Sequence, residues 1–196
     1  MNKKLISLLL IHFFQFLATS CDPCVCDPSK TFERTYNGLE LKAWDTSGFQ
    51  NIEISNETVN KNSFGLTFSV VFELNQIARI KSRLNFSSFG FASAYACSCP
   101  YDEFINVDPF KGITIMVTDT QTQEETDVTN NFTTYNYDGE QVTISELFQI
   151  RADWHDGFQL DLTTYDNIPD SSIFTVKIIL ESGLELFDQT IEINFE

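Results

Sequence analysis

Cysteine carries the most definite chemistry in this sequence. Four of the five cysteines form two Cys-x-Cys pairs, Cys24 with Cys26 and Cys97 with Cys99, and Cys21 precedes the first pair. Residues two apart in an extended strand point to the same side, so two such pairs on neighbouring segments are placed to form two cross-links. An odd cysteine left over in a secreted protein suggests a thiol with another role.

Three chemistries fit the two pairs. Exported chains meet an oxidising compartment, which favours disulfides, whereas four thiolates would suit zinc and unpaired thiols would suit redox chemistry. Bonds within each pair would close very tight rings, so we favour bonds between the pairs, with both cross-pairings open. Closing a loop of about 73 residues in this way contributes on the order of 4 kcal/mol in the chain-entropy model.

The remaining cysteine, Cys21, follows a segment with the residue order of an export signal. Lys3 and Lys4 precede an apolar run from Leu5 to Leu17, and small residues follow up to Ser20. This order resembles bacterial lipoprotein precursors, and the resemblance implies that residues 1–20 are removed and that Cys21 carries lipid such as palmitate. One alternative is an uncleaved membrane-spanning helix, which would need about 20 apolar residues, and this run is shorter. Another is an ordinary cleavage after Ser20, which would leave five thiols in the mature chain. Lipid on Cys21 leaves four thiols that can pair.

Catalytic groups are sparse in the rest of the chain. Its one histidine, His155, lies beside an Asp-Gly turn signal, and we interpret it as a solvent-facing loop residue. No catalytic triad, metal-ligand motif or cofactor motif is present in the sequence, so we expect a protein that is not an enzyme. A glycan-processing hydrolase with paired carboxylates is the alternative, although nothing selects a pair among 28 acidic residues.

Net charge and aromatic residues indicate the class of partner. A formal net charge of −16 repels nucleic acid and anionic headgroups. Trp154, Tyr135 and Tyr137 lie in turn-like segments, and we predict that they form an exposed surface for an envelope protein or a glycan. Trp44 ends an alternating strand, and we expect it in the core.

Strand patterns dominate the chain from Tyr36 onward. Alternating or strongly apolar runs rich in Ile, Val, Thr and Phe predict β-strands, and a final pair joined at Ser182-Gly183 predicts a β-hairpin. The main predicted strands are 36–45, 52–54, 64–74, 91–99, 112–118, 158–163, 174–180 and 184–195. We predict an all-β fold, an antiparallel β-sandwich with immunoglobulin-like topology, and a jelly roll as the alternative.

One short helix and several loops interrupt the strands. Thr143 and Glu146 have capping-box spacing, which predicts a helix over 143–150. Residues 127–139 and 166–172 have the composition of exposed loops. We therefore expect a signal peptide at 1–20, a Cys/Pro tether at 21–34 and a β-sandwich domain at 35–196.

Three elements carry a second resemblance. The strand Ile113–Thr118, the helical segment Ser145–Phe148 and the C-terminal hairpin resemble, in this order, small β-rich lipoproteins of Bacteroidetes type. That family has no assigned activity, so the resemblance implies a location in the cell envelope and a fold, and no function. We expect a membrane-tethered cell-envelope lipoprotein that serves as a binding or structural module. Outer membrane or cell surface is the expected location, although Asp22 after the cysteine favours inner-membrane retention in some sorting systems.

The cysteines yield a direct prediction. Protein purified from membranes should have the mass of a chain that begins at lipid-modified Cys21. Thiol titration under denaturing, non-reducing conditions should find almost no free thiol, because both Cys-x-Cys pairs are expected to form disulfides. Four reactive thiols, stoichiometric zinc by elemental analysis, or an unmodified Cys21 at the N-terminus would contradict this assignment.

Overall fold

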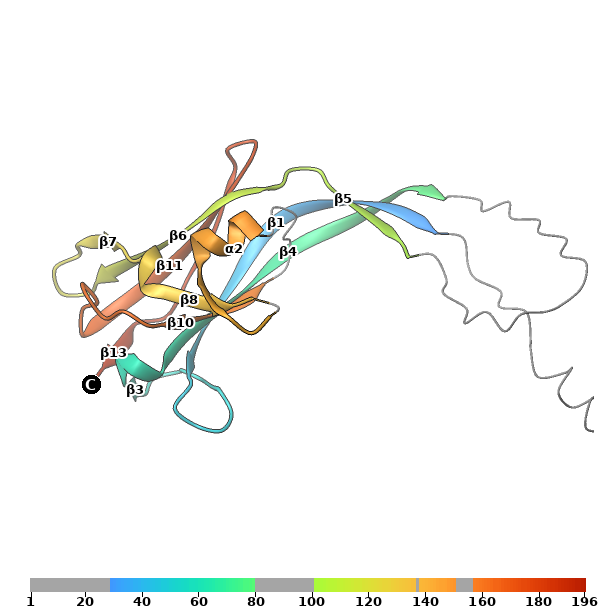
Figure 1. The fold of residues 1–196 in the computed structure, drawn as a ribbon. Coiled ribbons are helices and arrows are strands. Elements are labelled where there is room, and N and C mark those ends of the chain that lie inside the picture. Colours follow the sequence, from blue (N-terminus) through green and yellow to red (C-terminus); the bar gives the residue numbers. More distant parts are fainter. Residues whose placement is uncertain (1–28, 80–100, 137, 151–156) are drawn as a thin grey trace, which may run out of the picture. The chain divides into compact units, whose positions relative to one another are not determined.

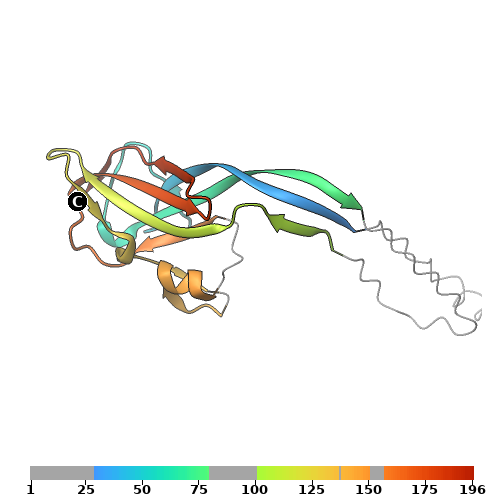
Figure 2. The ribbon, with the colours of Figure 1, turned by 90° about the horizontal axis from the view of Figure 1, so that it is seen from above.

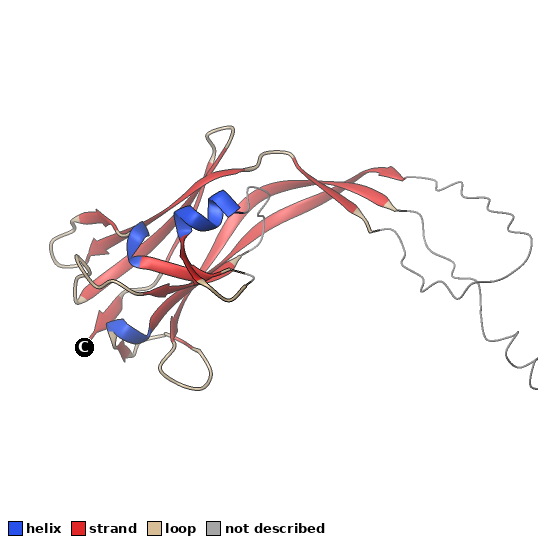
Figure 3. Ribbon diagram, in the orientation of Figure 1, coloured by secondary structure: helices blue, strands red, loops and turns tan. Residues whose placement is uncertain are grey.

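Strands make up most of the structure, a computed structural model that describes residues 29–79, 101–136, 138–150 and 157–196 (Figures 1 and 3). The strands form two sheets that pack as a β-sandwich. The structure thus confirms the expected all-β class.

Sheet A is seven-stranded and is antiparallel wherever its register is known. Strand β5 (Glu103–Asn106) pairs with β1 beside the main path. The main path runs in the order β2 (Ile52–Glu53), β1 (Lys30–Asp45), β4 (Phe64–Arg79), β10 (Phe158–Leu162), β8 (Phe132–Tyr135) and β9 (Gln141–Thr143).

Sheet B is six-stranded, and its central strands β6 and β11 run side by side (Figure 2). Strand β12 (Glu185–Gln189) pairs with β11 as the predicted hairpin, and Gly183 in its turn has φ of 88°. The pairing of β3 with β13 is parallel, and the other pairings are antiparallel. The path runs β3 (Thr58–Val59), β13 (Ile193–Phe195), β11 (Ser171–Leu180), β6 (Phe110–Asp119) and β7 (Glu125–Asp127).

Strand order identifies the topology. In sheet A the order β1-β4-β10-β8 corresponds to A-B-E-D of an immunoglobulin-like domain. In sheet B, β6 takes the place of strand C, β11 that of strand F, and β12 with β13 that of strand G. The expected immunoglobulin-like topology is therefore present, rather than the jelly-roll alternative.

By its contacts the chain divides into two compact units, residues 1–32 with 76–104 and residues 33–75 with 105–196. In the described part of the smaller unit, Ser29 Oγ donates to the Tyr101 carbonyl (2.9 Å) and Lys30 N donates to Asp102 Oδ1 (2.9 Å). The Phe32 and Phe104 rings stack there with centroids 5.6 Å apart. The larger unit contains the sandwich core.

Four phenylalanines join the two sheets at the centre of that core. Phe64 and Phe132 come from sheet A, and Phe174 and Phe195 come from sheet B. The Phe64 ring lies 4.8 Å from Phe174 and 5.2 Å, edge to face, from Phe195, and Phe132 lies 5.9 Å from Phe174. These rings are at most 8% exposed, so each contributes the full hydrophobic free energy of a buried aromatic side chain.

The structure confirms most of the predicted elements. Helix α2 (Ile144–Ile150) begins at the predicted capping box, in which Thr143 N donates to Glu146 Oε2 (2.8 Å) and Glu146 N donates to Thr143 Oγ1 (3.3 Å). Strand β1 already begins at Lys30, inside the segment expected to be a tether. The predicted strand 91–99 lies outside the described residues.

The predicted loop at 127–139 is wrong in part. Residues 125–127 form β7, a short 3-10 helix η2 (Thr129–Asn131) follows, and 132–135 form β8. Phe132 is fully buried in the phenylalanine cluster, so tertiary packing determines this segment despite its turn-forming asparagines. Asn131 instead donates its side-chain amide to the carbonyls of Thr164 and Asp166, which holds the next loop in place.

Glycine at position 157 provides a test of the packing between β4 and β10. A Cβ atom there would collide with backbone atoms of Phe68 and Ser69. We expect Gly157→Ala to lower the free energy of unfolding by about 2 kcal/mol or more, because paired backbone cannot move away cheaply. Urea unfolding measures the change.

Gly112 in β6 is the matched control, since a Cβ at Gly112 would meet nothing within 4 Å. Gly112→Ala should leave the protein unchanged or stabilise it by up to about 1 kcal/mol. Equal effects of the two substitutions would contradict the close approach at Gly157.

Candidate binding face

Sheet A presents its outer face on the side opposite the core. Alternation along each strand decides which side chains lie there. On β10, Leu160 and Leu162 are buried, whereas Gln159 is exposed and Asp161 is half-buried. On β8, the exposed Tyr135 follows the same rule. The alternating pattern of 158–163 in the sequence already indicated this division.

Strand register brings the outward residues into rows. Asp161 pairs with Gly65 of β4 on one side and with Thr133 of β8 on the other. Gln159 likewise pairs with Thr67, and Tyr135 pairs with Gln141 of β9. We call this surface the polar face; it comprises Thr67, Thr133, Tyr135, Gln141, Gln159 and Asp161.

Hydrogen bonds fix the side chains of the polar face. Asn51 Nδ2 donates to Gln159 Oε1 (3.0 Å), and Gln159 Nε2 donates to Asp161 Oδ1 (2.8 Å). Nearby, Gln141 Nε2 donates to Thr133 Oγ1 (2.7 Å). Each amide has a second N–H, and each acceptor oxygen has a further lone pair. The face therefore offers donors and acceptors in positions that are set before any ligand arrives.

Gly65 leaves room for the carboxylate in this network. A Cβ at Gly65 would lie 3.1 Å from the Leu160 carbonyl oxygen and 3.2 Å from Asp161 Oδ1. Any larger residue would therefore displace the Asp161 side chain or the paired strand. Glycine at this position keeps β4 and β10 close, with the carboxylate between them on the outer face.

One aromatic side chain, Tyr135, lies within the face, and a second, Trp44, lies beside it on β1. Tyr135 is 60% exposed. The bond from Thr46 N to the Ser63 carbonyl (2.7 Å) sets a register that places Trp44 across from Gly65. Trp44 is half-buried rather than fully in the core as expected, and its indole N–H is buried without a hydrogen-bond partner. Three strand spacings, about 14 Å, separate β1 from β8 across the sheet.

Of the aromatic residues predicted to form a binding surface, only Tyr135 is among the described residues. Trp154 and Tyr137 lie outside them, as do His155 and the residues Cys21, Cys24, Cys26, Cys97 and Cys99. The lipid, the disulfides and the role of Trp154 therefore stay predictions. The sequence analysis did not identify the hydrogen-bonded chain Asn51–Gln159–Asp161, because Asn51 lies between β1 and β2 and is 108 residues from Gln159.

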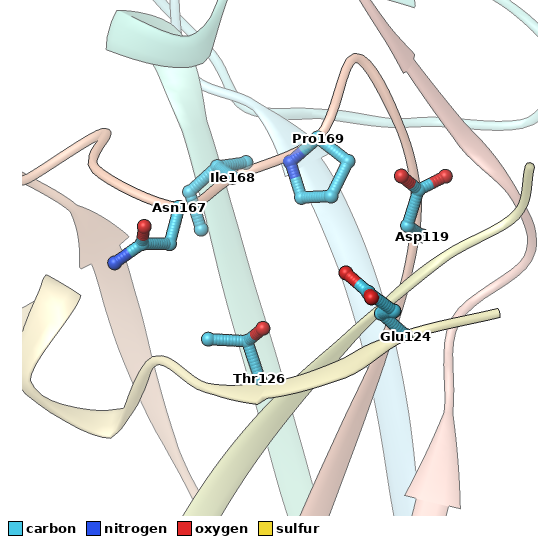
Figure 4. A pocket seen from close by; sticks show the side chains of 6 residues that line it. All are labelled: Asp119, Glu124, Thr126, Asn167, Ile168 and Pro169. Atoms are coloured by element: carbon cyan, nitrogen blue, oxygen red, sulfur yellow. The ribbon is translucent and has the colours of Figure 1, made fainter. Parts of the chain in front are cut away.

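A second candidate is a surface cavity of about 330 Å³ at the end of β6 (Figure 4). Asp119 and Glu124 line one side of it, and the loop Asn167–Pro169 lines the facing side (Figure 4). Two carboxylates in one cavity are the arrangement that a glycoside hydrolase would require. The bonds of these groups decide whether they fit that role.

Asp119 is committed to its own turn. Its Oδ1 accepts hydrogen bonds from Gln121 N (2.7 Å) and Thr122 N (3.3 Å), and the first of these is the main cause that lowers the pKa of the Asp119 carboxyl. A general acid in glycoside hydrolysis needs a raised pKa, which burial supplies. Glu124 is exposed to water. Asp119 therefore does not fit the role of the acid in hydrolysis.

Neither a metal centre nor a membrane-spanning helix is found in the part of the chain that the structure describes. No three His, Cys, Asp or Glu side chains within residues 29–79, 101–136, 138–150 and 157–196 are grouped so that they could hold a metal ion. No helix of those same ranges has the length and apolar character to cross a bilayer.

Comparison with models of protein families, with curated proteins and with solved structures found no match for this chain.

The turn at Asp119 yields a pH-dependent prediction. Its pKa is lower in the folded protein than the ordinary value of 3.8, so its bonds stabilise the fold fully above that value and are lost as the pH falls through the lowered pKa. We expect Asp119→Asn to be less stable than the native protein at pH 7. The difference should shrink below about pH 4. A difference that persists unchanged at strongly acid pH, measured by thermal unfolding, would contradict this role of the carboxylate.

Proposed function

We propose that this protein is a cell-envelope lipoprotein, held at a bacterial membrane by lipid on Cys21, whose immunoglobulin-like domain is a binding module. Its contact surface is the polar face of sheet A. The observation that carries the proposal is the set of polar side chains on this face, in which Gln159 bonds to Asn51 and Asp161 and Gln141 bonds to Thr133, with the exposed ring of Tyr135 among them.

Two further observations support binding rather than catalysis. The polar face consists of side chains on paired strands, which hold ligand-binding groups more precisely than loops do. The carboxylate of Asp119 in the one cavity described above has a lowered pKa and satisfies a turn, so it does not provide the acid of a hydrolase.

The outer face of sheet B is the natural comparison surface. Thr175 lies there on β11, next to Met116 and Gln189 on the neighbouring strands. Lys177 on the same face pairs with Glu185 at 3.1 Å. Thr175 and Thr133 are both half-buried threonines on inner strands, so one serves as the control for the other.

Site-specific photo-cross-linking tests the proposal. A photoreactive amino acid at position 133 of the full-length lipoprotein should capture envelope material in intact cells, whereas the same group at position 175 should not. Denaturing gels and mass analysis of the adducts provide the measurement. Equal capture at both positions, or none at position 133, would contradict a binding role for the polar face.

A further inference from the structure

We infer that the ligand of the polar face is an uncharged oligosaccharide, an inference that rests on the proposed binding function. The first reason is the chemistry of the face. Sugar hydroxyl groups both donate and accept hydrogen bonds, and planar amides and carboxylates offer paired donors and acceptors in return. Gln159 and Asp161 together provide both kinds of group, already oriented by their mutual bond.

The second reason is the position of the aromatic rings. The carbon-bound hydrogens of a sugar ring form an apolar patch that packs on an aromatic side chain, which contributes hydrophobic area and contact with the ring face. Tyr135 offers such a ring beside the amides. Trp44 lies three strand spacings from β8, in the row of Asp161 and Thr133, and Tyr135 is two residues further along β8, so the two rings are about 16 Å apart. This span is longer than one sugar ring and matches a short oligosaccharide.

The third reason is charge. The chain carries 28 acidic residues against 12 basic ones, and Asp161 lies within the face itself. Lys42, on the outward side of β1, is paired with Glu53 at 3.1 Å. An anionic polymer would therefore be repelled both by the chain and by the face. A neutral glycan meets no such penalty.

Direct binding measurements with the full-length protein in detergent test the inference. The probes are neutral β-linked glucan, xylan and mannan oligosaccharides and α-linked glucan oligosaccharides, with oligogalacturonate as the charged comparison. Calorimetry should detect saturable binding of at least one neutral probe and no binding of oligogalacturonate.

Matched substitutions locate the site. Tyr135→Ala and Thr67→Arg should each weaken binding on the order of tenfold or more. The first removes the aromatic ring, and the second places a long side chain on the polar face beside Gln159. Tyr135→Phe should retain binding, because it keeps the ring. Tyr165→Ala, an exposed tyrosine in the loop after β10, should also leave the affinity unchanged. Thermal unfolding confirms that each variant is folded.

The outcomes separate this inference from the proposal on which it rests. If no neutral oligosaccharide binds while cross-linking at position 133 still captures a protein, the glycan inference is overturned and the binding module stands. If a glycan binds equally well to all four folded variants, it occupies another site and the inference is again overturned. If neither glycan binding nor cross-linking occurs, both the inference and the proposed function fail.

Discussion

Packing of phenylalanine rings across the two sheets is the constraint on which the rest of this structure depends. Phe64, Phe132, Phe174 and Phe195 meet between the sheets. Because side chains alternate along a strand, burying Phe132 turns Thr133 outward, and burying Leu160 turns Gln159 and Asp161 outward. The core thereby determines which residues form the polar face.

A one-residue slip between β10 and its neighbours would exchange these two sets of residues. Such a slip would put Leu160 in water and Asp161 among the phenylalanines, at the cost of an unpaired buried carboxylate. The buried hydroxyl of Thr134, which donates to the Gln159 carbonyl at 2.8 Å, further ties β8 to β10. Stability and the proposed function therefore depend on the same register.

Local patterns explain how much the sequence predicts. The alternation in 158–163 and the Thr143–Glu146 capping box are local signals, and both led to the correct element. Residues 127–139 misled because Asn130 and Asn131 are turn formers, whereas burial of Phe132 depends on strands far away in the sequence. The bond between Asn51 and Gln159 was missed for the same reason: the two residues are 108 apart in the sequence, and Asn51 reaches β10 from the segment between β1 and β2 rather than from a neighbouring strand.

Packing on the inner side of β4 explains how the sheet can carry a polar network on its outer surface. Solvent-exposed hydrogen bonds between side chains contribute little to stability, so the Asn51–Gln159–Asp161 chain is not needed to hold the sandwich together. The network requires glycine at position 65, because a Cβ there would lie 3.2 Å from Asp161 Oδ1. A glycine within a strand weakens that strand. A stabilising contribution elsewhere in the core must offset this loss, and the four-ring cluster begins with Phe64, the neighbour of that same glycine. Strong packing on the inner side of β4 thus permits an outer side that is arranged for a ligand.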